Sequence, residues 1–312
     1  MSKIVDSIIG HAVGDAMGVP IEFTKREKLQ DKKVTKMLGY GTYDVCKGSW
    51  SDDTSMEIAL IDSLINKNGF DYKDIMNNFL CWMTQDKYTA NGEVFDVGIT
   101  CMNAILNYRS GIEPLKCGLN GEKNNGNGSL MRILPVALYS YYKKLSENDI
   151  ITLTNNVSSL THSHEISKLG CYIYVRYVMF LLDGLSKEEA YKKIQELNYD
   201  SYDEYAISKY NRILDNNIKE FEINDISSKG YIVDSLESSL WALLNNNNYE
   251  NTIIEAINLG NDTDTIGAIT GSMAGILYGM SSIPKDWLDD LLRKDYLIDI
   301  SKKFEGMILS KK

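Results

Sequence analysis

Several residue types are scarce in this chain of 312 residues, and each scarcity excludes something. There are four prolines, three histidines and five cysteines. Long stretches without proline favour helices. An odd number of cysteines with no C-x-x-C pair is typical of a reduced, cytoplasmic protein rather than of a secreted, disulfide-bonded one. Because histidine is rare and no cysteine cluster exists, the sequence also argues against a zinc site.

Basic residues are outnumbered, and long apolar runs are missing. Lys and Arg total 33 against 43 Asp and Glu, a formal net charge of −10. Binding along a nucleic acid needs a basic face, so we expect no general nucleic-acid binding. No uninterrupted apolar run reaches the length of about 18 residues that a membrane span needs, so we expect no membrane association. The N-terminus also lacks the apolar region of a signal peptide.

Hydrophobic residues make up 44% of the chain and recur mostly at every third or fourth position, the spacing of an amphipathic helix. Alternating, strand-like spacing is scarce, and residues 34–43 are the best candidate for a strand. No linker or repeat divides the sequence, so we predict one compact all-α, multi-helix domain over residues 1–312. Beyond residue 125, helices are expected near 129–143, 149–160, 165–183, 187–197, 202–218, 229–245, 250–259 and 264–280.

Two of the predicted helices carry a glycine at every fourth position. Glycine inside a helix costs roughly 1 kcal/mol relative to alanine, so a stripe of glycines needs a reason. At this spacing the glycines share one face of the helix, which predicts that another backbone packs tightly against it. Polar residues interrupt both segments, which excludes a membrane version of this packing. The two stripes are Gly10, Gly14 and Gly18, and Gly267, Gly271, Gly275 and Gly279.

Two short acidic segments precede predicted helices. Asp52 and Asp53 lie in the first, and Asp262 and Asp264 lie in the second, each beside Ser or Thr. Helix capping explains one such side chain per segment, and the first segment also matches a T-x-x-E capping box. Capping does not explain several, because clustered carboxylates repel one another unless a cation offsets the repulsion. Two such segments favour a metal site over simple capping.

The donor atoms of these segments select the type of ion. Carboxylates and hydroxyls are hard oxygen donors, which favour Mg²⁺, with Mn²⁺ as a possible substitute. Four carboxylates suffice for two ions about 3.5–4 Å apart, the separation found in two-metal sites. The sequence therefore predicts a binuclear magnesium site.

Five motifs in order give the chain a resemblance to the ADP-ribosylglycohydrolases, which include the dinitrogenase-reductase-activating glycohydrolase and the ADP-ribosylarginine hydrolases. Any one motif is weak, whereas five in the same order over nearly the whole chain are specific. They are GDAMGVPIEF at 14–23, WSDDTSM at 50–56, GNGSLMRILP at 126–135, TH at 161–162 and GNDTDTIGA at 260–268.

The resemblance implies an all-α fold with a metal-binding cleft that holds two Mg²⁺ ions. It assigns catalytic roles to Glu22 and Asp96, the latter on a short match. Family members usually have Thr where this chain has Ser51, and both residues carry the hydroxyl that binds metal. The implied metal ligands are Ser51, Asp52, Asp53, Asp262, Asp264 and Thr265. The implied substrate-binding residues are Gly98, Asn127, Gly128, Ser129, Met131, His162 and Tyr231.

Several of these residues also have plainer interpretations. Asp15 lies in a glycine-striped helix, and we interpret it as a buried hydrogen-bonding residue. If the family resemblance is set aside, the NGNGS segment at 125–129 is interpreted as a turn, although its backbone N–H groups also suit phosphate binding. His162 is equally well a satisfied core histidine, and Tyr231 an aromatic packing residue.

The function implied by the resemblance is a Mg²⁺-dependent hydrolase that removes ADP-ribose from modified protein side chains, with ADP-ribosyl-arginine as the expected linkage. Such an enzyme cleaves the glycosidic bond at C1 of the ribose, and its partners are the ADP-ribosylated protein and ADP-ribose. One alternative is a non-catalytic member that binds ADP-ribose or a partner in an immunity or structural role. Another is a different two-metal phosphohydrolase, which would cleave the pyrophosphate instead. Retention of oxygen donors at every implied ligand position favours the hydrolase.

Overall fold

The computed structural model describes residues 2–310 and confirms the all-α prediction. Within this part of the chain no strand forms, and only two isolated bridges, between Leu119 and His162 and between Gly126 and Tyr231, have strand-like pairing. The helices are α1 (Lys3–Gly18), α2 (Arg26–Asp31), α3 (Asp52–Lys67), α4 (Tyr72–Gln85), α5 (Ile99–Arg109), α6 (Leu134–Tyr142), α7 (Glu147–Ser159), α8 (Glu165–Leu182), α9 (Lys187–Gln195), α10 (Glu204–Lys209), α11 (Asn211–Leu214), α12 (Ile232–Asn245), α13 (Tyr249–Ile257), α14 (Thr263–Tyr278), α15 (Lys285–Asp290) and α16 (Lys294–Leu309).

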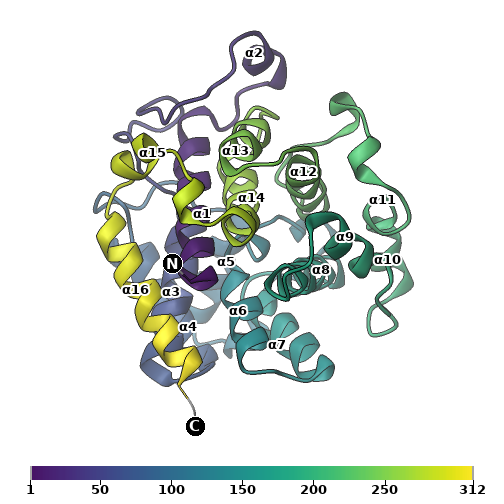
Figure 1. Cartoon of the computed structure of the whole chain (residues 1–312). Helices are drawn as coiled ribbons and strands as arrows, with labels where there is room; N and C mark the ends of the chain where they lie inside the picture. Colours follow the sequence, from purple (N-terminus) through teal and green to yellow (C-terminus); the bar gives the residue numbers. More distant parts are fainter. Residues whose placement is uncertain (1, 311–312) are drawn as a thin grey trace.

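Helices α1 and α14, from opposite ends of the sequence, pack together at the centre of the molecule (Figure 1). Their backbones approach so closely that a side chain at Gly10 would overlap the Gly271 carbonyl, and one at Gly14 would overlap the Gly267 carbonyl. The glycine stripes therefore have the role predicted for them, with one exception. Gly279 lies beyond the end of α14 at a φ of 78° and caps the helix instead of packing.

The remaining helices surround this pair (Figure 1). Helices α3 and α16 pack on one side of α1, while α12 and α13 pack against α14. Helix α8 contacts α12 and α14 and carries α6, α7 and α9. By length and composition alone, the stretch Lys3–Ile21 is apolar enough to cross a membrane, but an 18-residue window of it is entirely buried inside the protein, where the stretch forms the core helix α1 and the turn that follows it.

The prediction of a strand at residues 34–43 is wrong. No partner strand lies beside this segment, and the backbone of Val34 is bound by a side chain instead. Asn258 accepts a hydrogen bond from the Val34 amide at 2.9 Å and donates one to the Val34 carbonyl at 2.9 Å. The expected helix at 202–218 is divided at Tyr210 into α10 and α11, and α2, α15 and α16 were not predicted.

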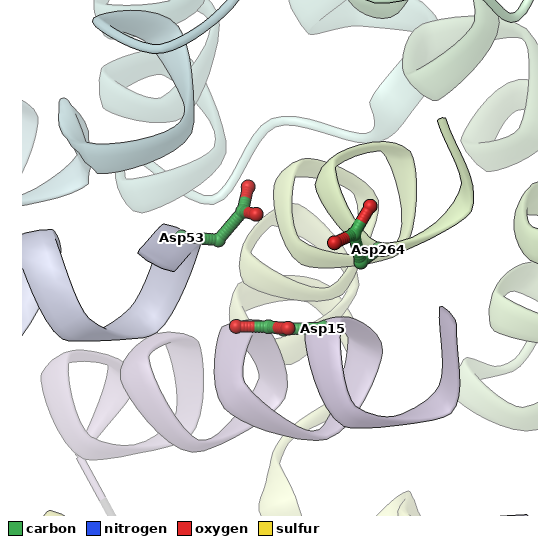
Figure 2. Close-up of side chains that lie close together, drawn as sticks. All are labelled: Asp15, Asp53 and Asp264. Atoms are coloured by element: carbon green, nitrogen blue, oxygen red, sulfur yellow. The ribbon is translucent and has the colours of Figure 1, made fainter. Parts of the chain in front are cut away.

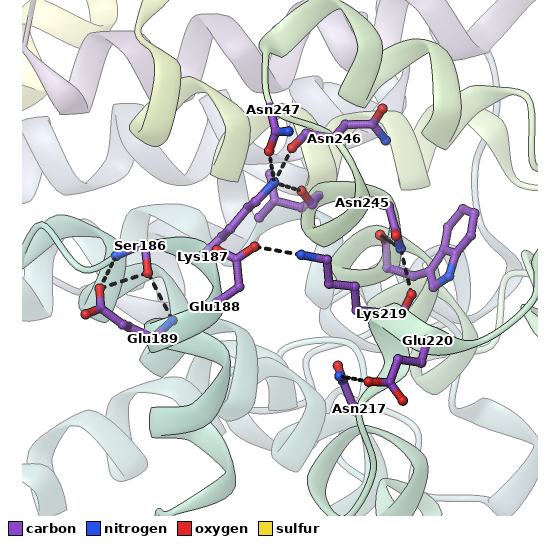
Figure 3. A network of polar contacts seen from close by, with 12 residues as sticks. Ser186, Lys187, Glu188, Glu189, Asn217, Lys219, Glu220, Asn245, Asn246 and Asn247 are labelled. Atoms are coloured by element: carbon purple, nitrogen blue, oxygen red, sulfur yellow. Dashed lines mark hydrogen bonds and ion pairs between the residues drawn. The ribbon is translucent and has the colours of Figure 1, made fainter.

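A buried lysine closes the C-terminal end of α12 (Figure 3). The ammonium of Lys187 donates to the carbonyls of Leu243, at 3.1 Å, and Asn246, and to the side chain of Asn247 at 3.0 Å. The carbonyls at the end of a helix lack the regular partners of the helix interior. The Leu243 carbonyl also accepts from the Asn246 amide at 3.4 Å, and the Asn246 carbonyl accepts from the Tyr278 hydroxyl at 2.9 Å, so the ammonium adds to bonds that these carbonyls already have. Lys187 thus joins the start of α9 to the end of α12.

We expect Lys187→Met to lower the free energy of unfolding by about 1–3 kcal/mol, because the apolar stem is kept while the three hydrogen bonds of the charged ammonium are lost. The matched control is Lys219→Met. Lys219 pairs with Glu188 at 3.0 Å, but both side chains are more than 40% exposed, so its loss changes stability by less than about 1 kcal/mol. Urea denaturation of both variants measures the difference, and equal effects would contradict the role given to Lys187.

We expect Gly14→Ala to lower the free energy of unfolding by about 2–3 kcal/mol, because the added methyl group forces α1 and α14 apart. Gly306→Ala in α16 is the matched control, since nothing lies within 4 Å of a side chain there. That change leaves stability unaltered or raises it by up to about 1 kcal/mol, as expected for an exposed helical position. Thermal unfolding of the two variants would contradict the packing account if their shifts had the same sign and size.

Candidate active site

The sequence motifs converge on one cleft with a volume of about 240 Å³. Ten of the predicted site residues line it: Glu22, Asp52, Asp96, Gly98, Asn127, Gly128, Met131, His162, Asp262 and Thr265. Five do not: Ser51, Asp53, Asp264, Ser129 and Tyr231. The lining comes from the segments after α1, before α5, between α5 and α6, between α7 and α8 and before α12, and from the N-terminal ends of α3, α5 and α14. The fold therefore assembles the cleft from most of the length of the chain.

Asp15 of α1 holds the start of α3 in place. Its carboxylate accepts hydrogen bonds from the Ser51 amide at 2.9 and 3.1 Å, from the Thr54 amide at 3.1 Å and from the Thr54 hydroxyl at 2.6 Å. Both of its oxygens are therefore occupied, and the carboxylate lies at the positive end of the helix. These contacts agree with the interpretation of Asp15 as a hydrogen-bonding residue, one that orients the neighbouring acidic segment.

Asp53 of α3 and Asp264 of α14 point toward one another above Asp15 (Figure 2). One oxygen of Asp53 accepts from the hydroxyls of Ser51, at 2.9 Å, and Thr265, at 3.3 Å. The Thr265 amide donates to one oxygen of Asp264 at 2.9 Å. The second oxygen of each aspartate, Oδ1 of Asp53 and Oδ2 of Asp264, is buried and has no hydrogen-bond partner.

A second acidic group adjoins the first. One carboxylate oxygen from each of Glu22, Asp96 and Asp264 lies within 4.8 Å of the others, and the same holds for Asp15, Asp53 and Asp264. Asp264 thus belongs to both groups. Oε2 of Glu22 is a third buried oxygen without a partner.

Strained backbone surrounds this acidic centre. Phe23, Asp96 and Asn261 are non-glycine residues in the left-handed region, with φ values of 60°, 52° and 61°. Phe23 follows Glu22, Asp96 is itself one of the acidic residues, and Asn261 precedes Asp262. The Phe23 amide donates to the Asn261 carbonyl at 2.6 Å, so two of these residues hold one another. Such conformations persist only where the surrounding structure enforces them, and they cluster at functional sites.

The carboxyl groups have raised pKa values, and burial is the main cause at each. Repulsion from Asp262 adds to burial and raises the pKa of Asp96 to about 6, and repulsion from Asp96 helps to raise the pKa of Glu22 to about 9. The pKa values of Asp53 and Asp264 lie well above the ordinary range for the same reasons. Ionising all of these groups together costs free energy that a cation would offset. The unpartnered oxygens and the hard donor set both fit a divalent ion, so these acidic clusters can hold metal ions.

Another wall of the cleft is formed by Gly126, Asn127 and Gly128 of the glycine-rich segment at 125–129. Asn127 ties this wall to the acidic centre, because its amide donates to Asp262 at 2.9 Å and to the Ser235 hydroxyl at 2.8 Å. Ser129 is buried behind the wall, where its hydroxyl contacts Ser158 at 3.0 Å. Tyr231 contributes through its backbone, which pairs with Gly126 in an isolated bridge.

Sequence reasoning missed several residues of the site. Ile99, Thr100, Cys101 and Gly230 line the cleft although nothing in their local sequence marks them. Tyr43 lies beside the acidic centre, where its hydroxyl opposes the rise in the pKa of both Glu22 and Asp96. It falls in the segment that was expected to be a strand, so no motif could reveal it.

Comparison with known proteins gives the same class of fold. The model of the ADP-ribosylglycohydrolase family matches residues 1–311, so the chain belongs to this family and is a glycohydrolase. It is 30% identical to the ADP-ribosylarginine hydrolase Tri1 of Serratia proteamaculans, over 97% of this chain and 79% of the relative. It is also 30% identical to the ADP-ribosyl-[dinitrogen reductase] glycohydrolase of Rhodospirillum rubrum, over 93% of this chain and 90% of the relative. A solved structure described as an ADP-ribosylglycohydrolase-related protein complex superposes with a TM-score of 0.83 at 26% identity, covering 98% of each chain.

We expect Mg²⁺ to raise the melting temperature, and to raise it more at pH 8 than at pH 5. Raised carboxyl pKa values mean that the folded protein holds these protons more tightly than the unfolded chain does. Without metal, stability therefore falls as the pH rises from about 4, the unfolded value, through the folded values near 6 and 9. A bound cation removes this penalty, which is largest at the higher pH.

Differential scanning fluorimetry with Mg²⁺ or EDTA at the two pH values measures the effect. Asp53→Asn is expected to shrink the Mg²⁺-induced shift, whereas Asp299→Asn, at a side chain that is 62% exposed, leaves it unchanged. A shift that is independent of pH, or equal in the two variants, would contradict a cation site at these carboxylates.

Proposed function

We propose that this glycohydrolase removes ADP-ribose from modified arginine side chains by cleaving the glycosidic bond at C1 of the ribose. The observation that carries the proposal is the acidic centre itself, in which three buried carboxylate oxygens without hydrogen-bond partners meet beside a cleft. Two relatives that are each 30% identical to the chain are named for hydrolysis of ADP-ribosylarginine and of ADP-ribosyl-dinitrogen reductase. The first name supports the arginine linkage, and the second supports an ADP-ribosylated protein as substrate.

The two implied catalytic carboxyl groups differ in the way that acid–base chemistry needs. With its pKa near 6, Asp96 is mostly ionised at neutral pH and is suited to accept a proton from an attacking water. Glu22, with a pKa near 9, keeps its proton and is suited to donate one to the departing group.

We propose that two Mg²⁺ ions, or Mn²⁺ in their place, complete the site. Their ligands would be Ser51, Asp52, Asp53, Asp262, Asp264 and Thr265. When bound, such ions orient the ribose hydroxyls and lower the pKa of a bound water. The hydrogen bonds of Asp15 to Thr54 and of Asn127 to Asp262 would hold the two acidic segments in position for these ions.

A non-catalytic role in binding ADP-ribose or a partner is the second candidate. The donors at all six implied ligand positions are intact, which favours catalysis, because a binding protein has no need to keep a costly cluster of buried carboxylates. We further propose a cytoplasmic, reducing location, since all five cysteines are free thiols.

The test incubates the protein with ADP-ribosyl-arginine and ADP-ribosyl-serine peptides, with Mg²⁺ or EDTA, and identifies the products by mass. We expect free ADP-ribose and unmodified arginine peptide in Mg²⁺ alone. Asp262→Asn abolishes this turnover and leaves the helical circular dichroism intact, while Asp299→Asn keeps full turnover. Full activity in Asp262→Asn, or activity in EDTA, would refute the proposal. Binding of ADP-ribose without turnover would favour the non-catalytic role.

A further inference from the structure

The charged side chains that line the cleft are all acidic. Among the described residues they are Glu22, Asp52, Asp96 and Asp262, and no Lys or Arg joins them. A ligand with a diphosphate is repelled by that wall unless metal ions screen it. Its phosphates therefore need donors from the part of the lining that carries no carboxylate, which includes the glycine-rich segment and His162.

A buried cation, Arg132, lies behind the glycine-rich segment. Arg132 is 0% exposed, and its guanidinium donates to the Gly128 carbonyl, to the Thr161 hydroxyl at 2.8 Å and to the Val157 carbonyl at 3.4 Å. It also stacks 5.0 Å from the centre of the Phe79 ring. No carboxylate of the described residues lies within ion-pairing distance of it, which is unusual because buried charges are normally paired.

The arginine determines where the proton of Thr161 points. A guanidinium only donates hydrogen bonds, so Thr161 Oγ1 accepts from Arg132 and keeps its own proton for another acceptor. His162 Nδ1 lies 2.8 Å from that hydroxyl. The competing acceptor is the sulfur of Cys101, which also neighbours Thr161 but accepts hydrogen bonds only weakly. The Thr161 proton therefore goes to Nδ1 of His162.

An imidazole that accepts at Nδ1 carries its single proton on Nε2. Burial, with a further contribution from the Arg132 charge, lowers the pKa of His162 to about 3, so the ring stays neutral and has one proton to place. Nε2 lies 3.6 Å from the Cβ position at both Gly126 and Gly128, and all three residues line the cleft. The absence of side chains at these glycines leaves the Nε2 edge of the ring open.

We propose that Arg132 and Thr161 are positioning residues that hold His162 as the Nε2–H tautomer, which donates a hydrogen bond to a phosphate of the bound ADP-ribosyl group. This proposal rests on the proposed function for the identity of the ligand. His162 then gives the cleft a neutral hydrogen-bond donor for an anion, while the positive charge of Arg132 stays buried behind the glycine-rich segment.

The first test reads the tautomer directly. Long-range ¹H–¹⁵N correlation spectra of the full-length protein distinguish protonation at Nδ1 from protonation at Nε2, and His162→Gln assigns the signal among the three histidines. We expect the Nε2–H form across the range from pH 6 to 8. An Nδ1–H ring in the unaltered protein would overturn the proposal whatever any variant does.

The second test measures binding by calorimetry in Mg²⁺. Thr161→Val is expected to lower the affinity for ADP-ribose by about tenfold, the effect of roughly one hydrogen bond. Its affinity for adenosine, which has no phosphate, is expected to stay unchanged. Thr161→Ser keeps the hydroxyl and restores ADP-ribose affinity. Equal loss for both ligands, no loss in Thr161→Val, or failure of Thr161→Ser to restore affinity would each overturn the proposal.

These outcomes are separable from failure of the proposed function. A protein that binds ADP-ribose but hydrolyses no peptide would refute the catalytic proposal. The spectra and the binding data would then still decide whether Arg132 and Thr161 position His162. Conversely, a hydrolase whose His162 carries its proton on Nδ1 would keep its function and lose this inference.

Discussion

Mutual repulsion among buried carboxylates is the constraint on which the site depends. Asp53 and Asp264 each use one oxygen in hydrogen bonds and leave the other buried without a partner. A folded protein seldom keeps such oxygens, because an unpaired buried acceptor costs about 1–3 kcal/mol and more when it is charged. Their persistence at one point, beside a cleft, is best explained by a ligand that supplies positive charge.

The central helix pair makes this crowding possible. Glycines let the backbones of α1 and α14 touch, which brings Asp15 of one helix beside the N-terminal end of the other. Asp15 then fixes the start of α3 and with it Asp53. The glycine stripes and the acidic segments are therefore parts of one arrangement, since wider packing of the two helices would move the carboxylates apart.

Local sequence patterns predicted the helical class and the acidic segments, and the family resemblance supplied most of the other cleft residues, but α2, α15 and α16 were not predicted. The period of the apolar residues predicted the all-α class, and the paired acidic segments predicted a shared acidic site, whose cleft Asp52 and Asp262 both line. Tyr43 and Arg132 could not be found in this way. The role of each depends on neighbours distant in the sequence, such as Asp96 for Tyr43 and Thr161 for Arg132. The supposed strand at 34–43 failed for the same reason, because the side chain of Asn258 satisfies the backbone of Val34.

The two walls of the cleft have complementary chemistry. One gathers acidic oxygens that suit cations, and the other offers glycines, a neutral histidine and a hidden arginine, which suit an anion. The most direct measurement is anomalous diffraction from crystals soaked in Mn²⁺. The account predicts manganese peaks in contact with Asp53, Asp264 and the neighbouring acidic residues. Clear density for the acidic segments with no metal peak among them would contradict it.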